Sequence, residues 1–438
     1  MKETSTPERL TVSVVTGLVV ERDAISNICR QQIEEIDRYA HSQQIPLDLK
    51  LFLHGTNVPD LRTVKMSTPK ELACHPHYQK SNLVLFHFGI YYPIFDALPA
   101  APRSARLVVN YYGITPPALA SADSHDVLHR SFRQATHLLE ADRVLVNSRF
   151  IRDEALAMGI RPERLDVLPL PAAFPIPDHI PLKPVNEELR IAYLGRIVPA
   201  KGIAELMGAM KRFAEHQRVH LTLMGARLFS SPALIAEIEE AMRSGPLVGK
   251  CELLLDRPGA EVRERLATSD LFVMPSHHEG FCVPVIEAMS CGAGIICTSA
   301  GALPETSGGL GQTYPAGDAD ALYDRLCQFA KDWSEGCYST ESGAVPREEW
   351  VVRAAEHLQT FRRERFRDNF LRHALSDVRC PPMSQAELIS ESRVRAFLRL
   401  SETSGAVPEP GSIAGHIEGV LARAGQRRRR IPKSGAQK

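Results

Sequence analysis

The chain has 438 residues, more than a single core of ordinary size accommodates, so its length predicts two or three domains. Lys plus Arg and Asp plus Glu both number 52, so no net charge draws the protein toward nucleic acid, and we expect no nucleic-acid partner. Nine cysteines, an odd number without C-x-x-C pairs, are typical of reduced thiols in a cytosolic protein and favour neither disulfides nor a metal site.

The first apolar run extends from Leu10 to Val20. Like every other apolar run of the chain, it falls short of the roughly 18 residues that a membrane span needs. It lies between charged residues and lacks a small-residue cleavage site, so it predicts a first core strand rather than a signal peptide. We therefore expect a cytoplasmic protein.

Residues 1–170 alternate β-rich apolar runs with helix-like stretches, which predicts an N-terminal α/β domain with a largely parallel sheet. Six prolines follow between Leu168 and Pro184; they forbid helix and discourage a central strand, so residues 171–186 are predicted to be an extended linker. The strands expected before the linker are TVSVVTGLV, LDLKLFLHG, SNLVLFHFG, RLVVNYYG and DRVLVNS.

The alternation restarts over residues 187–345 and predicts a second doubly wound domain. In its first helix an apolar stripe falls at helical spacing, which favours a core face over a ligand surface. The stripe consists of Ile203, Leu206, Met207, Met210 and Phe213. The expected strands are LRIAYLG, HLTLMG, CELLLD, LFVMPS and GIICTS, and the expected helices are IAELMGAMKRFAEH, SPALIAEIEEAMR, AEVRERLATS and VPVIEAMS.

The text after residue 345 is first charged and helical, over residues 346–375, and then polar, over residues 376–438. The polar tail ends in four arginines, Arg427 to Arg430, which suit an anionic membrane surface. A solvated, partly flexible tail is favoured, and a peripheral contact with the inner surface of the membrane stays open.

Two carboxylates, Glu279 and Glu287, stand out in the otherwise apolar segment PSHHEGFCVPVIEAMSCG. The segment reads as the end of a buried strand, a loop, and a helix whose first turn holds Pro284. Glu279 would lie in the loop and Glu287 about one turn inside the helix, so both can face a ligand held over the helix N-terminus. A helix-cap acid and a partnered helix acid are the structural alternative.

The loop GRIVPAKG places Arg196 and Lys201 at the carboxyl end of the second domain's first strand. A guanidinium, an ammonium and helix N-terminal amides suit a diphosphate. The spacing from Gly195 to Lys201 is not that of a Walker loop, and two exposed bases in a turn remain the alternative. Because the two loops share one sheet edge, a nucleoside diphosphate sugar would match cations at one end and carboxylates at the other.

These residues carry a resemblance to a known family. GRIVPAKG, LMG and SDLFVMPSHHEGFCVPVIEAMSCGAGIICTSAGALPE, within residues 189–330, resemble the nucleotide-sugar domain of family 4 retaining glycosyltransferases, the glycosyl transferases group 1. The first half is similar more weakly, through DAISN, HFG, ITPP and ADRVLVNSRF, to members that act in polysaccharide and lipopolysaccharide assembly. The resemblance implies the GT-B architecture, in which two Rossmann-like domains face each other across a deep cleft and the C-terminal helices cross back to the first domain.

The resemblance also implies roles for individual residues. Glu279 would contact the donor sugar where the chemistry occurs, Arg196 and Lys201 would hold the diphosphate, and His87 would reach a sugar hydroxyl. Glu287 would bind the ribose. The remaining donor-binding positions would be Gly17 and Gly195 in the glycine loops, Arg257 and Pro258 at the base, and Phe281, Cys282 and Val283 at the sugar.

Three positions depart from the family pattern. Cys282 stands where glycine usually follows Glu-Gly-Phe, which would narrow the space for the donor sugar. Gly17 is followed by Leu18 rather than by further glycines. Tyr112 and Gly113 precede ITPP where related sequences often have His-Asn, which bears on the acceptor side.

The function implied by the resemblance is transfer of a hexose from a UDP- or GDP-linked donor to a glycan or glycolipid acceptor, with retention and without a metal or other cofactor. Two alternatives stay open. One is a nucleotide-sugar 2-epimerase of the same fold, which needs no acceptor. The other is a catalytically silent scaffold that binds sugar nucleotides, suggested by Cys282 and Tyr112.

Overall fold

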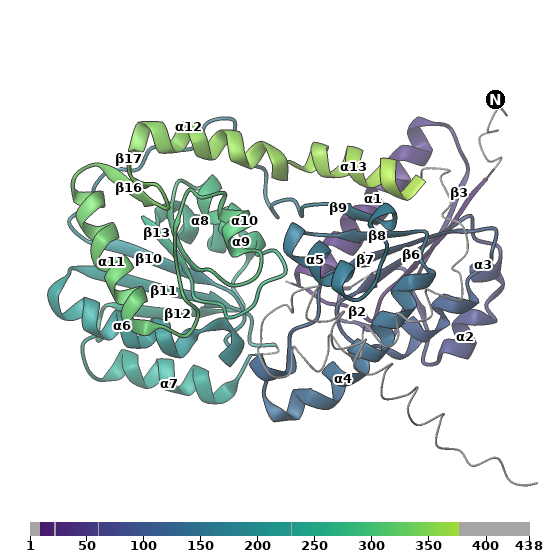
Figure 1. Ribbon diagram of the computed structural model, residues 1–438, viewed down its shortest axis with the longest axis horizontal. Coiled ribbons are helices and arrows are strands. Elements are labelled where there is room, and N and C mark those ends of the chain that lie inside the picture. The colour runs from purple at the N-terminus through teal and green to yellow at the C-terminus, as the bar shows by residue number, and fades with distance from the viewer. Residues whose placement is uncertain (1–8, 22, 60, 229, 376–438) are drawn as a thin grey trace, which may run out of the picture.

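The computed structural model describes residues 9–375 apart from residues 22, 60 and 229. The predicted polar tail, with Arg427 to Arg430, lies outside this part of the chain. Two α/β domains lie side by side, and two helices near the C-terminus run along the top of both (Figure 1).

The N-terminal domain is built on a seven-stranded, fully parallel sheet with the order β5-β3-β1-β6-β7-β8-β9. Its strands are β1 (Leu10–Val15), β3 (Leu47–Leu53), β5 (Val64–Lys65), β6 (Leu83–Phe88), β7 (Arg106–Tyr111), β8 (Arg143–Val146) and β9 (Leu165–Val167). The α-helices of the domain are α1 (Ala24–Ser42), α2 (Pro69–Ala73), α3 (Pro76–Gln79), α4 (His125–Gln134) and α5 (Arg149–Ala157). Five 3-10 helices complete it: η1 (Pro93–Ala100), η2 (Pro117–Leu119), η3 (Ala122–Ser124), η4 (Ala135–Glu140) and η5 (Pro162–Arg164).

The first apolar run, expected to be one strand, is divided in two. The chain leaves the main sheet at Thr16, and β2 (Leu18–Val19) pairs in parallel with β4 (Gly55–Thr56) in a separate small sheet. The break falls at Gly17, where a Cβ atom would lie 2.9 Å from the Tyr92 ring. The close approach of this ring therefore requires glycine at the end of β1.

The C-terminal domain contains a six-stranded parallel sheet with the order β12-β11-β10-β13-β14-β15. Its strands are β10 (Leu189–Leu194), β11 (Val219–Gly225), β12 (Cys251–Leu255), β13 (Leu271–Met274), β14 (Gly294–Thr298) and β15 (Gln312–Tyr314). Its helices are η6 (Pro199–Lys201), α6 (Ile203–His216), α7 (Pro232–Arg243), α8 (Gly259–Thr268), α9 (Val283–Ser290), α10 (Leu303–Ser307) and α11 (Ala319–Ser334). In sequence order the strands run 3-2-1-4-5-6, which is the doubly wound order of a Rossmann domain.

The helices of this domain form two groups. α6 packs with α7 and α11, whereas α9 packs with α8, α10 and α12. The predicted stripe of α6 faces inward: Ile203, Leu206, Met207, Met210 and Phe213 are all buried, which confirms the core interpretation. Burial of this stripe against the sheet contributes most of the helix's stability, as expected for an amphipathic helix.

The alternation of strands and helices over residues 187–345 predicted a parallel sheet and did not predict an antiparallel hairpin near the end of the domain. Strands β16 (Cys337–Thr340) and β17 (Gly343–Pro346) pair with each other. Tyr338 from this hairpin stacks on Trp350 at 4.1 Å between ring centroids and donates a 2.5 Å hydrogen bond to the carbonyl oxygen of Gly292. The hairpin thus ties the last helices to the core of the C-terminal domain.

Residues 168–188 contain no helix or strand, and the proline-rich segment lies within them. A second connection between the domains follows the hairpin. α12 (Arg347–Leu358) packs on α9, η7 (Gln359–Phe361) interrupts the helix, and α13 (Arg363–Leu375) packs on α1 and β7 of the N-terminal domain (Figure 1). The charged segment predicted to be helical, residues 346–375, therefore forms two helices, because Arg362 has extended backbone angles between them.

Ion pairs hold α13 on the N-terminal domain. The Arg363 guanidinium lies 2.6 Å from Glu34 and 3.2 Å from Glu35 of α1. Near the other end of α13, the His373 ring lies 3.2 Å from Asp166. Phe366 and Phe370 of α13 are buried in the same hydrophobic cluster as the outer face of β1 and the linker, so one apolar core runs from one domain into the other.

Candidate active site

Two loops of the C-terminal domain meet where the strand order reverses, between β10 and β13. The main-chain N–H of His277 donates to the carbonyl oxygen of Ala200 at 2.9 Å, and the Ser276 hydroxyl donates to the same oxygen at 3.2 Å. Gly202 permits this contact, because its φ is +64° and a Cβ atom there would lie 2.0 Å from the carbonyl oxygen of Pro275. Ligands bind at such reversal points in open α/β sheets.

The structure joins two predicted residues, Lys201 and Glu279, in an ion pair with 2.5 Å between Nζ and Oε1. Their side chains are only 15% and 13% exposed, so the pair is less screened by water than a surface pair. Arg196 is exposed and makes no ion pair with any described residue. Its carbonyl oxygen accepts a 2.8 Å hydrogen bond from the Tyr193 hydroxyl, which fixes the loop and leaves the guanidinium available to an anion.

Glu287 lies inside α9, as the sequence predicts, and is buried. Its Oε1 accepts a 3.2 Å hydrogen bond from the main-chain N–H of Ala173 in the linker. Burial raises the pKa of Glu287 to about 7, against an ordinary value of 4.5, because the protein interior disfavours the charged carboxylate. A hydroxyl that donated to this carboxylate would favour the charged form.

The segment between the two acids has a strained backbone. Cys282 caps α9 with a φ of +84°, a conformation that suits glycine and costs a residue with a Cβ atom about 1–2 kcal/mol. Its side chain is buried, and burial together with the neighbouring Glu279 carboxylate raises the pKa of the thiol. The chain on either side is fixed: the Phe281 carbonyl oxygen accepts a 2.5 Å hydrogen bond from the Thr306 hydroxyl, and Val283 begins the helix.

Sequence reasoning missed Gly301, the glycine that shapes the other side of this loop. Its φ is +63°, and a Cβ atom there would lie 2.3 Å from the carbonyl oxygen of Glu279. The next N–H, of Ala302, donates to the same oxygen at 2.8 Å. Gly301 stands in the segment SAGALPE, so its position just after a buried strand was the signal that could have identified it.

His87 lies in β6 of the N-terminal domain and is buried. Its Nδ1 lies 2.8 Å from the Tyr112 hydroxyl, whereas its Nε2 is buried without any hydrogen-bond partner. Burial lowers the pKa of His87 to about 3, so the ring is neutral at physiological pH. Gly17, at the end of the neighbouring strand β1, packs against Tyr92, whose hydroxyl donates to the His87 carbonyl oxygen at 2.8 Å.

The remaining predicted positions are divided between the centre and the edge of the sheet. Gly195 is in the β10 loop, where its N–H donates to the Met224 carbonyl oxygen at 3.0 Å. Arg257 and Pro258 are exposed and follow β12, the edge strand. The Arg257 guanidinium lies 3.8 Å from Glu261, and no described contact joins it to the Lys201–Glu279 pair.

Contacts across the domain boundary also reach the Glu279 loop, and no local sequence pattern indicates them. The Ser148 hydroxyl donates to the Gly280 carbonyl oxygen at 2.7 Å, and the main-chain N–H of Arg149 lies 2.9 Å from a Glu305 carboxylate oxygen. The His278 ring lies 3.4 Å from Glu154, a buried carboxyl whose pKa is raised by burial. The N-cap Ser148 and the helix residue Glu154 of α5 thus contact the residues on both sides of Glu279.

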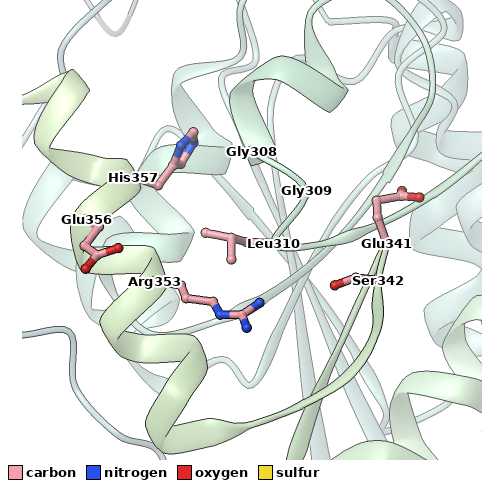
Figure 2. A pocket seen from close by; sticks show the side chains of 8 residues that line it. All are labelled: Gly308, Gly309, Leu310, Glu341, Ser342, Arg353, Glu356 and His357. Carbon is pink, nitrogen blue, oxygen red and sulfur yellow. The ribbon is translucent and has the colours of Figure 1, made fainter.

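A cavity of about 510 Å³ opens on the C-terminal domain between the β16–β17 turn and α12 (Figure 2). Arg353, Glu356 and His357 of α12 line it, with Arg353 pointing toward Leu310 and Ser342 in Figure 2, and none of the predicted site residues lines it.

The described residues, 9–375 with three gaps, hold no cluster of three or more His, Cys, Asp or Glu side chains arranged for a metal ion. Within the same residues no helix is long and apolar enough to cross a membrane.

Two doubly wound domains, with a cation–carboxylate loop pair at the reversal point of the second, have the GT-B architecture. Residues 188–332 match the family described as glycosyl transferases group 1. This match supports a glycosyltransferase similar to that group. The match falls on the domain that holds Arg196, Lys201, Glu279 and Glu287.

Curated relatives agree with this assignment. The chain is 27% identical over 332 residues to the O-antigen chain mannosyltransferase B of Escherichia coli, covering 70% of this chain and 84% of the relative. It is 28% identical over 262 residues to the alpha-maltose-1-phosphate synthase of Mycolicibacterium smegmatis, covering 53% of this chain and 66% of the relative.

Solved structures share the fold at low sequence identity. The lipopolysaccharide outer core galactosyltransferase WaaB in its apo form superposes with a TM-score of 0.59 at 14% identity, covering 84% of this chain and 99% of that chain. Anabaena HepE in complex with UDP and glucose superposes with a TM-score of 0.57 at 16% identity, covering 84% of this chain and all of that chain. These likenesses establish the GT-B fold.

Proposed function

We propose that the protein transfers a hexose from a nucleoside diphosphate sugar, linked to UDP or GDP, to a glycan or glycolipid acceptor in the cytoplasm, with retention at the anomeric carbon and without a metal. The observation that carries the proposal is the Lys201–Glu279 pair beside the unpaired Arg196 at the reversal point of the sheet. Cations there suit the diphosphate, and the carboxylate suits the sugar hydroxyls.

The donor would lie along the two loops in a fixed direction. Glu287, about one helical turn beyond the loop, would accept hydrogen bonds from the ribose, because a carboxylate has two acceptor oxygens and the described structure gives it one donor, Ala173. The diphosphate would lie over the β10 loop, next to Arg196 and Lys201. The sugar would then reach Glu279 and the backbone N–H groups of Phe281 and Cys282.

The chemical step would break the bond between the anomeric carbon and the diphosphate oxygen, and the electron pair leaves with the diphosphate. Arg196 and Lys201 would stabilise this negative charge, which is the main electrostatic demand of the step. The acceptor hydroxyl oxygen would bond to the anomeric carbon on the same face, and its proton would pass to the departing phosphate oxygen. No side chain then has to act as a strong base.

The names of the relatives support the class of acceptor. The Escherichia coli relative is a mannosyltransferase of the O-antigen chain, and WaaB is a galactosyltransferase of the lipopolysaccharide outer core. HepE was solved with UDP and glucose. By analogy we propose a UDP- or GDP-linked hexose as the donor and a growing polysaccharide or lipopolysaccharide as the acceptor, with contact to the inner surface of the membrane left to experiment.

A thermal-shift screen of UDP, GDP and their hexose derivatives tests the donor, because a ligand that binds only the folded state raises the midpoint of unfolding. The selected donor is then incubated with a panel of glycan and glycolipid acceptors, and the anomeric configuration of the product is read by NMR. We expect a retained linkage in the presence of EDTA. Release of the 2-epimer without an acceptor, or binding without transfer to any acceptor, would contradict the proposal.

A further inference from the structure

Tyr112 connects the two domains at the candidate site. It follows β7 directly, and its main-chain N–H donates to the Phe88 carbonyl oxygen at 2.9 Å. Its ring stacks on His87 with 6.1 Å between centroids and 15° between planes, and its hydroxyl lies 2.8 Å from His87 Nδ1. A Cβ atom on Gly280, the residue after Glu279, would lie 2.6 Å from the Tyr112 carbonyl oxygen.

The hydrogen-bond inventory of the two side chains determines which one donates. Neutral imidazole has one N–H and one acceptor nitrogen, and a phenol has one proton to donate. The described residues offer the Tyr112 hydroxyl no partner other than His87 Nδ1. If Nδ1 carried the proton, both the phenol O–H and Nε2 would lack a partner; if the phenol donates, only Nε2 does. Unmade hydrogen bonds at buried groups are costly, so the second arrangement is favoured.

Burial keeps both groups in the protonation states that this arrangement needs. It lowers the pKa of His87 to about 3 and raises the pKa of Tyr112 well above its ordinary value, so the ring is neutral and the phenol keeps its proton.

We propose that Tyr112 is a positioning residue: its hydroxyl donates to Nδ1 of His87, holds the ring in the Nε2–H tautomer, and so presents an N–H donor to an oxygen of the donor sugar. The contact between His87 and the donor sugar rests on the function proposed above, whereas the tautomer of His87 does not depend on that function. The buried, unpartnered Nε2 is the group in need of a partner, and a hydroxyl oxygen of a hexose can supply one. Tyr112, which stands where related sequences often have the His of His-Asn, would then orient His87 within the donor site.

The neighbouring tyrosine offers a matched control. Tyr111 is also buried at the end of β7, but its ring stacks on Phe88 and its hydroxyl has no hydrogen-bond partner among the described residues. Removing the Tyr111 hydroxyl therefore removes the same atom from an adjacent residue without touching His87.

The test measures tautomers first. Protein labelled with ¹⁵N-histidine is studied by long-range ¹H–¹⁵N NMR at pH 7, and the His87 signals are assigned by their loss in His87→Gln. We expect the Nε2–H form in the wild type and in Tyr111→Phe, and a mixture of both tautomers in Tyr112→Phe. An Nδ1–H ring in the wild type, or an unchanged ring in Tyr112→Phe, would overturn the proposal.

Kinetics with the donor identified in the thermal-shift screen test the consequence. Tyr112→Phe should lower kcat/KM on the order of 10-fold to 100-fold, as expected when the outer partner of a functional histidine is lost. Tyr111→Phe should leave it unchanged, and Tyr112→Phe added to His87→Gln should cost nothing more. Equal losses in both tyrosine variants, or a further loss in the double variant, would count against a role through His87. If no sugar nucleotide binds, the proposed function fails, and the NMR result still decides the tautomer.

Discussion

The Ser148 hydroxyl of the N-terminal domain donates a 2.7 Å hydrogen bond to the Gly280 carbonyl oxygen of the C-terminal domain. The same oxygen atom of Ser148 accepts from the main-chain N–H of Ile151 at 3.1 Å and caps α5. The Ser148 side chain thus caps the N-terminus of α5 in one domain and holds Gly280, the residue after Glu279, in the other. The position of the donor loop therefore depends on how the two domains are oriented.

Replacing Ser148 with alanine should cost more than the loss of an ordinary helix cap. Ser231 is the matched control, because its hydroxyl accepts from Leu234 N–H at 3.4 Å and caps α7 within the C-terminal domain alone. We expect about 1 kcal/mol of destabilisation for Ser231→Ala. For Ser148→Ala we expect roughly 1 kcal/mol more, because the Gly280 carbonyl oxygen also loses its donor. Urea unfolding measures both, and equal losses would show that the cross-domain bond contributes nothing.

Lys201→Ala should lower kcat by about 10²–10³, the range for removing one preorganised group that stabilises developing negative charge. The reason is that the ammonium, held 2.5 Å from Glu279, would act on the leaving diphosphate. Arg218→Ala is the control, since Arg218 forms an equally short ion pair with Glu187 but both side chains are more than 70% exposed. A nearly normal rate in Lys201→Ala would contradict the assignment, whereas Arg218→Ala should be indistinguishable from the wild type.

Affinity for the sugar nucleotide should rise with pH and level off above about pH 7. The pKa of Glu287 in the free protein is raised to about 7, and ribose hydroxyls that donate to the carboxylate would lower it, so binding releases a proton below pH 7. The same raised pKa stabilises the free protein below pH 4.5, and this stability is lost as pH rises through about 7.

Calorimetry from pH 5 to pH 8 tests this prediction, with a diphosphate donor whose own charge is constant over the range. Glu287→Gln should flatten the dependence. Glu349→Gln, on the outer surface of α12, should retain it. A wild-type affinity that does not change between pH 5 and pH 8 would argue against ribose binding at Glu287.

At position 282 a glycine variant should be more stable than an alanine variant, which reverses the usual order of stability. Both Cys282→Ala and Cys282→Gly remove the buried thiol, but only glycine relieves the backbone strain at a φ of +84°. We expect the glycine variant to be more stable than the alanine variant by about 1 kcal/mol. The midpoints of urea unfolding decide this, and an alanine variant of higher stability would exclude strain at this position. The glycine variant should also accept a wider range of donor sugars in the thermal-shift screen.

The local pattern was sufficient to predict the strand, loop and helix around Glu279 and Glu287. A short apolar run, two breakers and a proline at the helix start each act on neighbouring residues. Parallel strands then bring the β10 and β13 loops to one edge. The bonds of Ser148 to Gly280 and of Glu154 to His278 could not be predicted, since they join residues 132 and 124 positions apart and depend on the orientation of two domains. The close contact between Gly301 and Glu279 likewise depends on the packing of the β14 loop.

Phe370→Ala in α13 should destabilise the N-terminal domain by about 3–5 kcal/mol, because the ring is fully buried and its removal leaves a cavity. Val352→Ala in α12 is the control. Its side chain is 57% exposed, so we expect a change within about 0.5 kcal/mol. Hydrogen exchange followed by mass spectrometry would locate the effect of Phe370→Ala in α1 and β7; protection lost only in the C-terminal domain would contradict the packing role of α13.

The place of α13 also has a consequence for synthesis. The C-terminal domain is contiguous from β10 to α12, whereas the N-terminal domain includes a helix encoded after it. Domains commonly fold in order as they leave the ribosome. Here the domain that is translated first remains incomplete until residue 375 has emerged, so the later domain can reach its final form while the earlier one still exposes the apolar face of α1. Emergence of α13, rather than translation of the first half of the chain, completes the N-terminal domain.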